Sequence, residues 1–198
     1  MNNLLLSFTL LFSKLPSSRT NLIGLMILSL ITLMSFRLNA APVLEATYNS
    51  GIQNGWVKVE RWNSNNINIM QESFPSDGRG DQSGQRVTFF GGDSTPHSAD
   101  FLLYHAPGWS TNTKATPVLL VHGANQDADI AWANPNDAGN YGCGRTFCPN
   151  TGLMQDLDSD NFKVFALSFA HKNGDGYYWA QQVADAIEII KNKTGASE

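Results

Sequence analysis

The feature that most constrains this fold is a short apolar run, Val118–Val121, that ends abruptly in His122-Gly123. The run is β-branched at both ends, and Pro117 precedes it. Such a run is typical of a strand buried on both faces of a parallel sheet, because a buried helix would need more residues. Beyond the carboxyl end of such a strand, backbone N–H groups are free to face a ligand. The sequence therefore predicts an α/β fold with a binding loop directly after this strand.

Before this run, the pattern is that of an antiparallel sheet. Residues 41–54 show no clear period and are predicted to form an extended linker, so the folded domain is expected at 55–198. Alternating or compact apolar segments bounded by turn residues predict four strands, at 56–62, 67–74, 86–90 and 99–105.

After the run, helices and strands alternate, which implies right-handed parallel crossovers. A short helix is predicted at 127–132, a second one from the N-cap Thr151, a central strand at 162–169 and a long helix at 177–193. Asp175 is the expected cap of the long helix and Gly195 its expected end. Its apolar residues recur at helical spacing, at Trp179, Val183, Ile187 and Ile190.

The first 40 residues have the layout of a secretory signal peptide. Lys14 and Arg19 precede an apolar segment at 21–36, and small residues around Ala40 follow it. The apolar core of about 15 residues is short for a spanning helix. The sequence therefore predicts a secreted protein, extracellular or periplasmic, with no stable membrane span after cleavage. An uncleaved anchor is the alternative, because residues 4–12 are apolar too.

The charge balance argues against nucleic acid as a partner. The chain has 13 Lys and Arg against 17 Asp and Glu, a formal net charge of −4. No acidic residue lies in the first 40, so the remainder is more acidic than the whole chain. An acidic domain is soluble and disfavours binding to nucleic acid or to an anionic membrane surface.

The strand, the His-Gly pair and the loop with Asn125 resemble the oxyanion loop of α/β-hydrolases. In that family one oxyanion N–H comes from the loop after the third strand and another from the residue after the nucleophile. The chain looks like the N-terminal part of a secreted lipase or esterase, related to class 2 lipases and, more loosely, to extracellular polyhydroxyalkanoate depolymerases. The resemblance covers about 55–198 and is best at 117–123 and 162–169. It implies an α/β-hydrolase fold, incomplete here, with antiparallel strands followed by the first parallel β-α-β-α units.

The resemblance also assigns roles to four residues. Ala124 and Asn125 are the expected oxyanion donors through their backbone N–H groups, and His122 and Gly123 complete the oxyanion loop. His122 is expected to orient the loop by hydrogen bonding rather than to act as a base. The alternative is that these residues form only a tight turn after the core strand of another α/β domain.

A nucleophile elbow, G-x-S-x-G, is absent from the sequence. Three serines come nearest, but their neighbours do not fit the elbow: Ser94, Ser110 and Ser168. We therefore assign no catalytic residue within this chain and expect the serine, the acid and the histidine of the triad beyond Glu198. The expected activity is hydrolysis of a carboxylic ester or lipid, with this chain inactive alone. The alternative is a secreted, non-catalytic binding module on a small α/β scaffold.

The two cysteines, Cys143 and Cys148, are close together in a chain with a secretion signal. This spacing predicts a small disulfide loop, with free thiols as the alternative. No second pair of Cys or His follows at ligand spacing, so neither a metal nor another cofactor is expected. Asp127 and Asp129 are acidic residues in a loop and are expected to be solvated rather than to bind a cation.

The remaining candidates are histidines and aromatic residues. His97, His105 and His171 have no partner at catalytic or metal spacing and are expected at the surface or in the core. Trp179 is expected in the core. Three further aromatic residues fit either the core or the wall of an acyl pocket: Trp132, Tyr177 and Tyr178.

Overall fold

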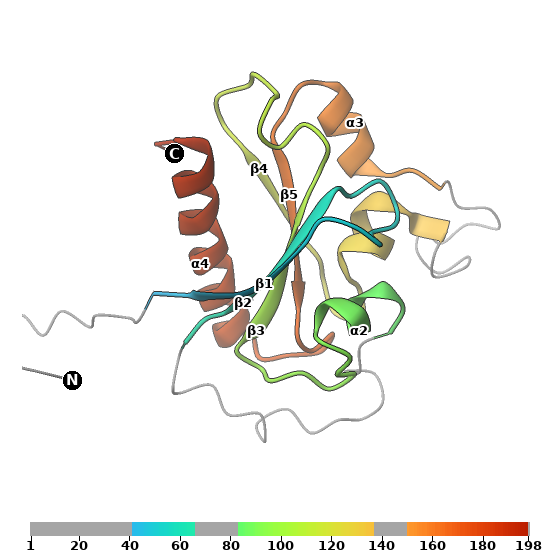
Figure 1. Ribbon diagram of the computed structural model, residues 1–198, viewed down its shortest axis with the longest axis vertical. Coiled ribbons are helices and arrows are strands. Elements are labelled where there is room, and N and C mark those ends of the chain that lie inside the picture. The colour runs from blue at the N-terminus through green and yellow to red at the C-terminus, as the bar shows by residue number, and fades with distance from the viewer. Residues whose placement is uncertain (1–40, 66–82, 137–149, 198) are drawn as a thin grey trace, which may run out of the picture. The chain divides into compact units, whose positions relative to one another are not determined.

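The computed structural model describes residues 41–65, 83–136 and 150–197 (Figure 1). They form a mixed five-stranded sheet in the order β1-β2-β3-β5-β4. The strands are β1 (Val43–Tyr48), β2 (Lys58–Asn63), β3 (Asp100–His105), β4 (Val118–Val121) and β5 (Val164–Phe169). Strands β1, β2, β3 and β5 pair antiparallel in turn, and β4 pairs with β5 in parallel. The predicted combination of antiparallel strands with a parallel crossover is therefore confirmed.

Helices cover both faces of this sheet. Figure 1 shows α4 (Gly176–Thr194) on one side and α2 (Gln85–Phe89) and α3 (Leu153–Ser159) on the other. A single π-helical segment, η2 (Asp129–Ala133), follows β4, where a short helix was predicted. None of the helices in the described ranges is long and apolar enough to cross a bilayer.

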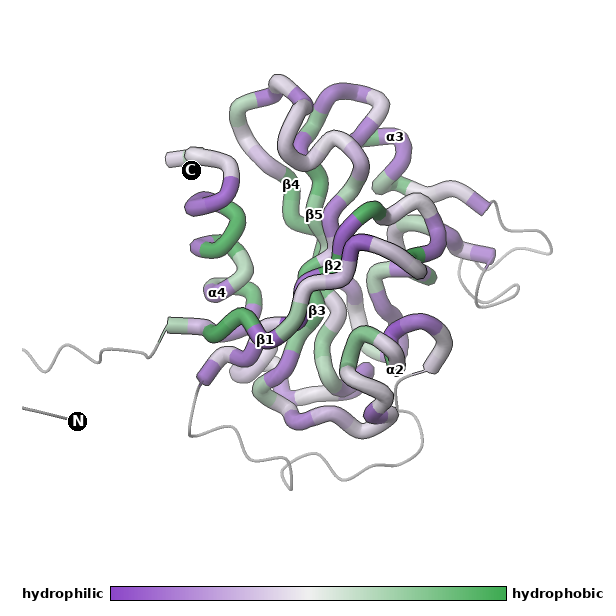
Figure 2. The backbone as a smooth tube through the Cα atoms, viewed as in Figure 1, coloured by the Kyte–Doolittle hydropathy of each residue, from purple (hydrophilic) through white to green (hydrophobic). Residues whose placement is uncertain are grey.

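Each face of the sheet has its own apolar core, and hydrophobic segments follow the central strands in Figure 2. Alternate residues of β3 point into different cores, as expected for a pleated strand. On the α4 side the core includes Phe101, Leu103, Phe165, Leu167, Phe169 and Ile190. On the α2 and α3 side it includes Phe89, Leu102, Tyr104, Val164, Ala166 and Met154.

The long helix α4 largely follows the sequence pattern. Asp175 is its N-cap, and the Asp175 Oδ1 accepts a hydrogen bond of 2.7 Å from the Tyr177 amide. Gly195 ends it with a left-handed φ of 70°, which glycine adopts without steric cost. The predicted apolar stripe is in part exposed, since 43 % of the Ile187 surface is accessible.

Two predicted elements before β3 were wrong. The predicted strand 86–90 is the helix α2, in which Arg86 and Phe89 are buried three residues apart. Its apolar run is too short for period to separate a helix from a strand. The predicted linker 41–54 contains β1, which pairs with β2. Most β1 residues are exposed, so no alternation marked this edge strand in the sequence.

The start of α3 also differs by one residue. Gly152 is its N-cap rather than Thr151, and the Gln155 side chain accepts the Gly152 amide proton at 2.8 Å. Three predictions lie outside the described residues: the signal peptide at 1–40, the strand at 67–74 and the disulfide between Cys143 and Cys148.

Candidate functional site

The candidate site is the loop that follows β4, residues 122–125. Because β4 and β5 are parallel, this loop and the one that follows β5 leave the sheet at the same edge. The Asn125 amide donates to the Lys172 carbonyl at 2.9 Å. The Asn173 side chain donates to Asn125 Oδ1 at 2.8 Å. The two loops are therefore joined at the carboxyl ends of the parallel strands, where the sequence placed the binding loop.

His122, the first residue of the loop, is held in place by burial and by hydrogen bonds of its ring. The residue is 4 % exposed, and its Nε2 accepts a hydrogen bond of 3.4 Å from the Phe169 amide. Nδ1 lies 2.8 Å from the Gly123 carbonyl oxygen, which can only accept. These two partners define a neutral imidazole with its proton on Nδ1, and burial lowers the pKa of His122 accordingly. In this arrangement His122 orients the loop through hydrogen bonds.

The loop itself is a turn from Gly123 to Gln126. The Gln126 amide donates to the Gly123 carbonyl at 3.3 Å, and within the turn a positive φ is confined to Asn125, at 61°. Asn tolerates this conformation better than most residues. Gly123, Ala124 and Asn125 are all exposed. The turn thus presents its backbone to solvent at the edge of the sheet.

The two predicted oxyanion donors differ in this turn. The Asn125 amide is already bonded to Lys172, whereas the Ala124 amide has no hydrogen-bond partner among the described residues. An exposed amide in a fixed turn can donate a hydrogen bond to a negatively charged oxygen without first breaking another hydrogen bond. The geometry therefore leaves Ala124 as the candidate donor.

A buried ion cluster lies immediately after the loop. The guanidinium of Arg86, on α2, lies 3.0 Å from Asp127 Oδ2 and 3.2 Å from Asp129 Oδ2. All three side chains are at most 3 % exposed. The prediction that the two aspartates are solvated was wrong, because their partner comes about 40 residues earlier in the chain. The sequence did indicate that Arg86 could be buried, since this residue stands directly before an apolar run, but it did not indicate its partners.

Further polar groups surround this cluster, and the sequence interpretation missed them. The Gln85 side chain donates to both carboxylate oxygens of Asp129, at 2.8 and 2.9 Å. Burial raises the pKa of Asp129 and that of the fully buried Tyr104 hydroxyl. Burial and the nearby Arg86 charge lower the pKa of Lys172.

The three serines that come nearest to the nucleophile-elbow pattern are either buried in a strand or exposed on loops. Ser168 is buried within β5, and its hydroxyl accepts the Ala128 amide proton at 3.0 Å, at the start of η2. Ser94 and Ser110 are exposed on loops. Ser168 is therefore a buried hydrogen-bond acceptor that holds the start of η2 on β5.

The other three histidines differ in their surroundings. His97 is exposed and accepts a hydrogen bond from the Ala99 amide at 3.1 Å. His105 is buried between Trp109 and Phe165. His171 is buried, and its Nε2 lies 2.9 Å from the Ser98 hydroxyl.

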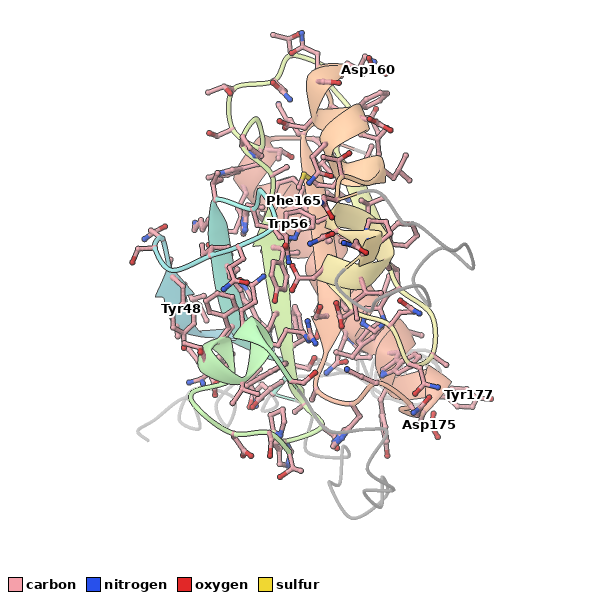
Figure 3. The ribbon with its side chains drawn as sticks, turned by 90° about the vertical axis from the view of Figure 1, so that its right-hand side faces the viewer. Tyr48, Trp56, Asp160, Phe165, Asp175 and Tyr177 are labelled. Atoms are coloured by element: carbon pink, nitrogen blue, oxygen red, sulfur yellow. The ribbon has the colours of Figure 1, made fainter. Side chains whose placement is uncertain are left out.

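Two aromatic residues near the start of α4 behave differently. Trp179 stacks on Phe169, with ring centroids 4.4 Å apart and an interplanar angle of 7°, which confirms the core prediction. Tyr177 is 89 % exposed and projects from the beginning of α4 in Figure 3. Trp132 is partly buried against the core on the α2 side.

No group of three His, Cys, Asp or Glu side chains suited to a metal ion occurs among residues 41–65, 83–136 and 150–197. No family model, curated protein or solved structure matches the chain.

Proposed function

We propose that this chain supplies the oxyanion loop of a secreted serine ester hydrolase of the lipase and esterase type, with an α/β-hydrolase fold. The observation that carries the proposal is the exposed Ala124 amide, which has no partner among the described residues. It lies at the carboxyl end of a parallel strand, in a turn that His122 and Lys172 hold in place. The antiparallel strands ahead of the parallel pair support the same resemblance.

The chemistry requires a serine outside these 198 residues. A histidine removes the hydroxyl proton as the serine oxygen bonds to the ester carbonyl carbon, and the carbonyl electron pair moves onto its oxygen. Ala124 and the residue after the nucleophile donate N–H groups to this oxyanion. The alcohol then leaves with the proton from the histidine, and water releases the acid from the acyl-serine in the same way. Substrates of this class include simple esters, lipids and polyesters.

The source gene provides the direct test. We expect its reading frame, followed beyond codon 198, to encode an apolar strand, then G-x-S-x-G, and later an acidic residue and a histidine. The product of that frame should hydrolyse a short p-nitrophenyl ester and react with a fluorophosphonate, whereas the chain Ala41–Glu198 alone should do neither. A product without ester hydrolysis would contradict the proposal, as would labelling of Ser94, Ser110 or Ser168 in the short chain.

A further inference from the structure

We propose that Arg86 is a positioning residue for the loop 122–125, an inference that rests on the proposed role of that loop. Arg86 acts through Asp127, which begins the segment that follows the loop. The Asp127 Oδ2 lies 3.0 Å from the Arg86 Nη2 and has no hydrogen bond to any other described residue. Both side chains are almost completely buried, so water does not replace this contact when it is lost.

Asp127 transmits this contact to the backbone. Its other oxygen, Oδ1, accepts the amide protons of Asp129 and Ile130, both at 2.9 Å, and so fixes the start of η2. The amide of Ala128, the residue after Asp127, donates a hydrogen bond to the Ser168 hydroxyl of β5. The chain is thereby held on β5 and on α2 directly after the loop.

The loop lies between two buried anchors. His122 is the first, and it is bonded to the backbone of β5 through Phe169. Asp127 is the second, three residues beyond Ala124. A short turn with both ends fixed has few conformations, which keeps the Ala124 amide pointed in one direction. Preorganised donors of this kind are what stabilise an oxyanion, because they need not reorient during the reaction.

The guanidinium group suits this role better than an ammonium group would. Its two terminal nitrogens reach separate carboxylates, Nη2 that of Asp127 and Nη1 that of Asp129. Nη2 also lies 3.2 Å from the Ser83 hydroxyl. A planar fork spans these partners at once, whereas a lysine offers one compact charge. An Arg86→Lys substitution therefore retains the charge and loses the geometry.

Hydrogen–deuterium exchange on the whole chain tests this inference. Asp127→Asn keeps an oxygen for the Asp129 and Ile130 amides but weakens the contact with Arg86. In this variant and in Arg86→Lys, we expect the Asn125 amide to exchange at least about tenfold faster than in the wild type. Asp93→Asn is the matched control, because Asp93 also caps a turn, at an exposed site, by accepting the Thr95 amide proton.

Amides in the centre of β5 report global unfolding. The inference predicts that Asn125 exchange accelerates by a larger factor than exchange of the Ala166 amide, and that Asp93→Asn changes neither. Equal acceleration at both amides would show that Arg86 serves overall stability alone, and an unchanged Asn125 would show that it does not hold the loop. Either result overturns the inference. The measurement requires no esterase activity, so its failure is distinct from failure of the proposed function.

Discussion

Two buried ion clusters lie on opposite faces of the sheet, and they are built in opposite ways. The loop cluster (Arg86, Asp127 and Asp129) has one cation between two carboxylates. The helix cluster (Glu60, Lys58 and Lys193, with His105 beside them) has one carboxylate between two lysines, at 2.5 and 2.8 Å. Arg86 is 3 % exposed, whereas the two lysine side chains are 19 % and 23 % exposed. The first cluster is sealed from water, and the second one is open to it at its cationic end.

This difference in composition and exposure gives the two clusters different roles in the fold. In the helix cluster, burial favours the neutral form of Glu60, but the hydrogen bonds from Lys193 and Lys58 and the charges of His105 and Lys193 together lower its pKa. Lys58 and Lys193 each contact Glu60 Oε1, and the cluster joins the end of α4 to β2. In the loop cluster, burial raises the pKa of Asp129, and Arg86 is the one cation of the described residues at ion-pair distance from the two carboxylates. A cluster of that kind specifies a local geometry at the expense of stability.

Removal of the single cation should have the largest effect. Arg86→Met leaves two buried carboxylates without a cation, and we expect a loss of about 3–5 kcal/mol in the free energy of unfolding. Urea unfolding followed by tryptophan fluorescence measures it. Arg61→Met is the matched control, since Arg61 pairs with a partly exposed Glu45 and should cost at most about 1 kcal/mol.

The same experiment has a second arm in case Arg86→Met does not fold. Asp127→Asn and Asp129→Asn, combined with Arg86→Met, remove the unpaired charges and should recover part of the stability. The contrast between the clusters would be wrong if Arg86→Met cost no more than Arg61→Met.

Acid should act on the helix cluster through His105. Burial lowers the pKa of His105 to about 4, from an unfolded value of 6.5. Between these values the unfolded chain binds a proton that the folded chain does not, so stability is full above pH 6.5 and falls as the pH is lowered. The loss should reach about 3 kcal/mol at pH 4. Urea unfolding at a series of pH values measures the slope.

A substitution tests whether His105 causes this dependence of stability on pH. His105→Phe keeps an aromatic ring against Trp109 and Phe165 and should flatten the dependence between pH 6.5 and 4. His97→Gln, at an exposed histidine, should leave the dependence as it is. A slope that survives His105→Phe would assign the acid sensitivity to another group.

Removal of one lysine should have the smallest effect. Lys193→Met leaves Lys58 bonded to Glu60, and because the lysine is partly exposed we expect a loss of about 1 kcal/mol or less. The double variant Lys58→Met/Lys193→Met should cost more than the sum of the single variants, since it alone leaves Glu60 buried without a cation. Strict additivity would show that the two lysines do not substitute for each other.

The elements that the sequence predicted correctly are those marked by a local pattern of apolar or capping residues. The run Val118–Val121, the strand at 162–169 and the caps of α4 each have a local pattern that their final environment reinforces. The loop at His122 was predicted for the same reason, because the apolar run of the buried strand stops at Val121 and His-Gly follows it.

The elements that were missed depend on tertiary contacts. The strand β1 lies at the edge of the sheet, where exposure on both faces removes any alternation. The helix α2 is one short turn stabilised by the burial of Arg86 and Phe89. The pairing of Arg86 with Asp127 joins residues 41 positions apart, and nothing local indicates which cation a buried aspartate will meet. The bond that occupies the Asn125 amide likewise comes from another loop.

The Ala124 amide is tested most directly by a substitution that removes its N–H group and is compatible with the backbone of the turn. Ala124→Pro suits the second position of a turn, where proline is favoured, and the preceding Gly123 tolerates the restriction that proline imposes. Ala124→Ser keeps the amide and is the control. In the proposed ester hydrolase, we predict that Ala124→Pro lowers kcat about 10²–10³-fold while the serine variant stays near the wild type. A folded proline variant that hydrolyses esters at the wild-type rate would contradict the oxyanion role of this loop.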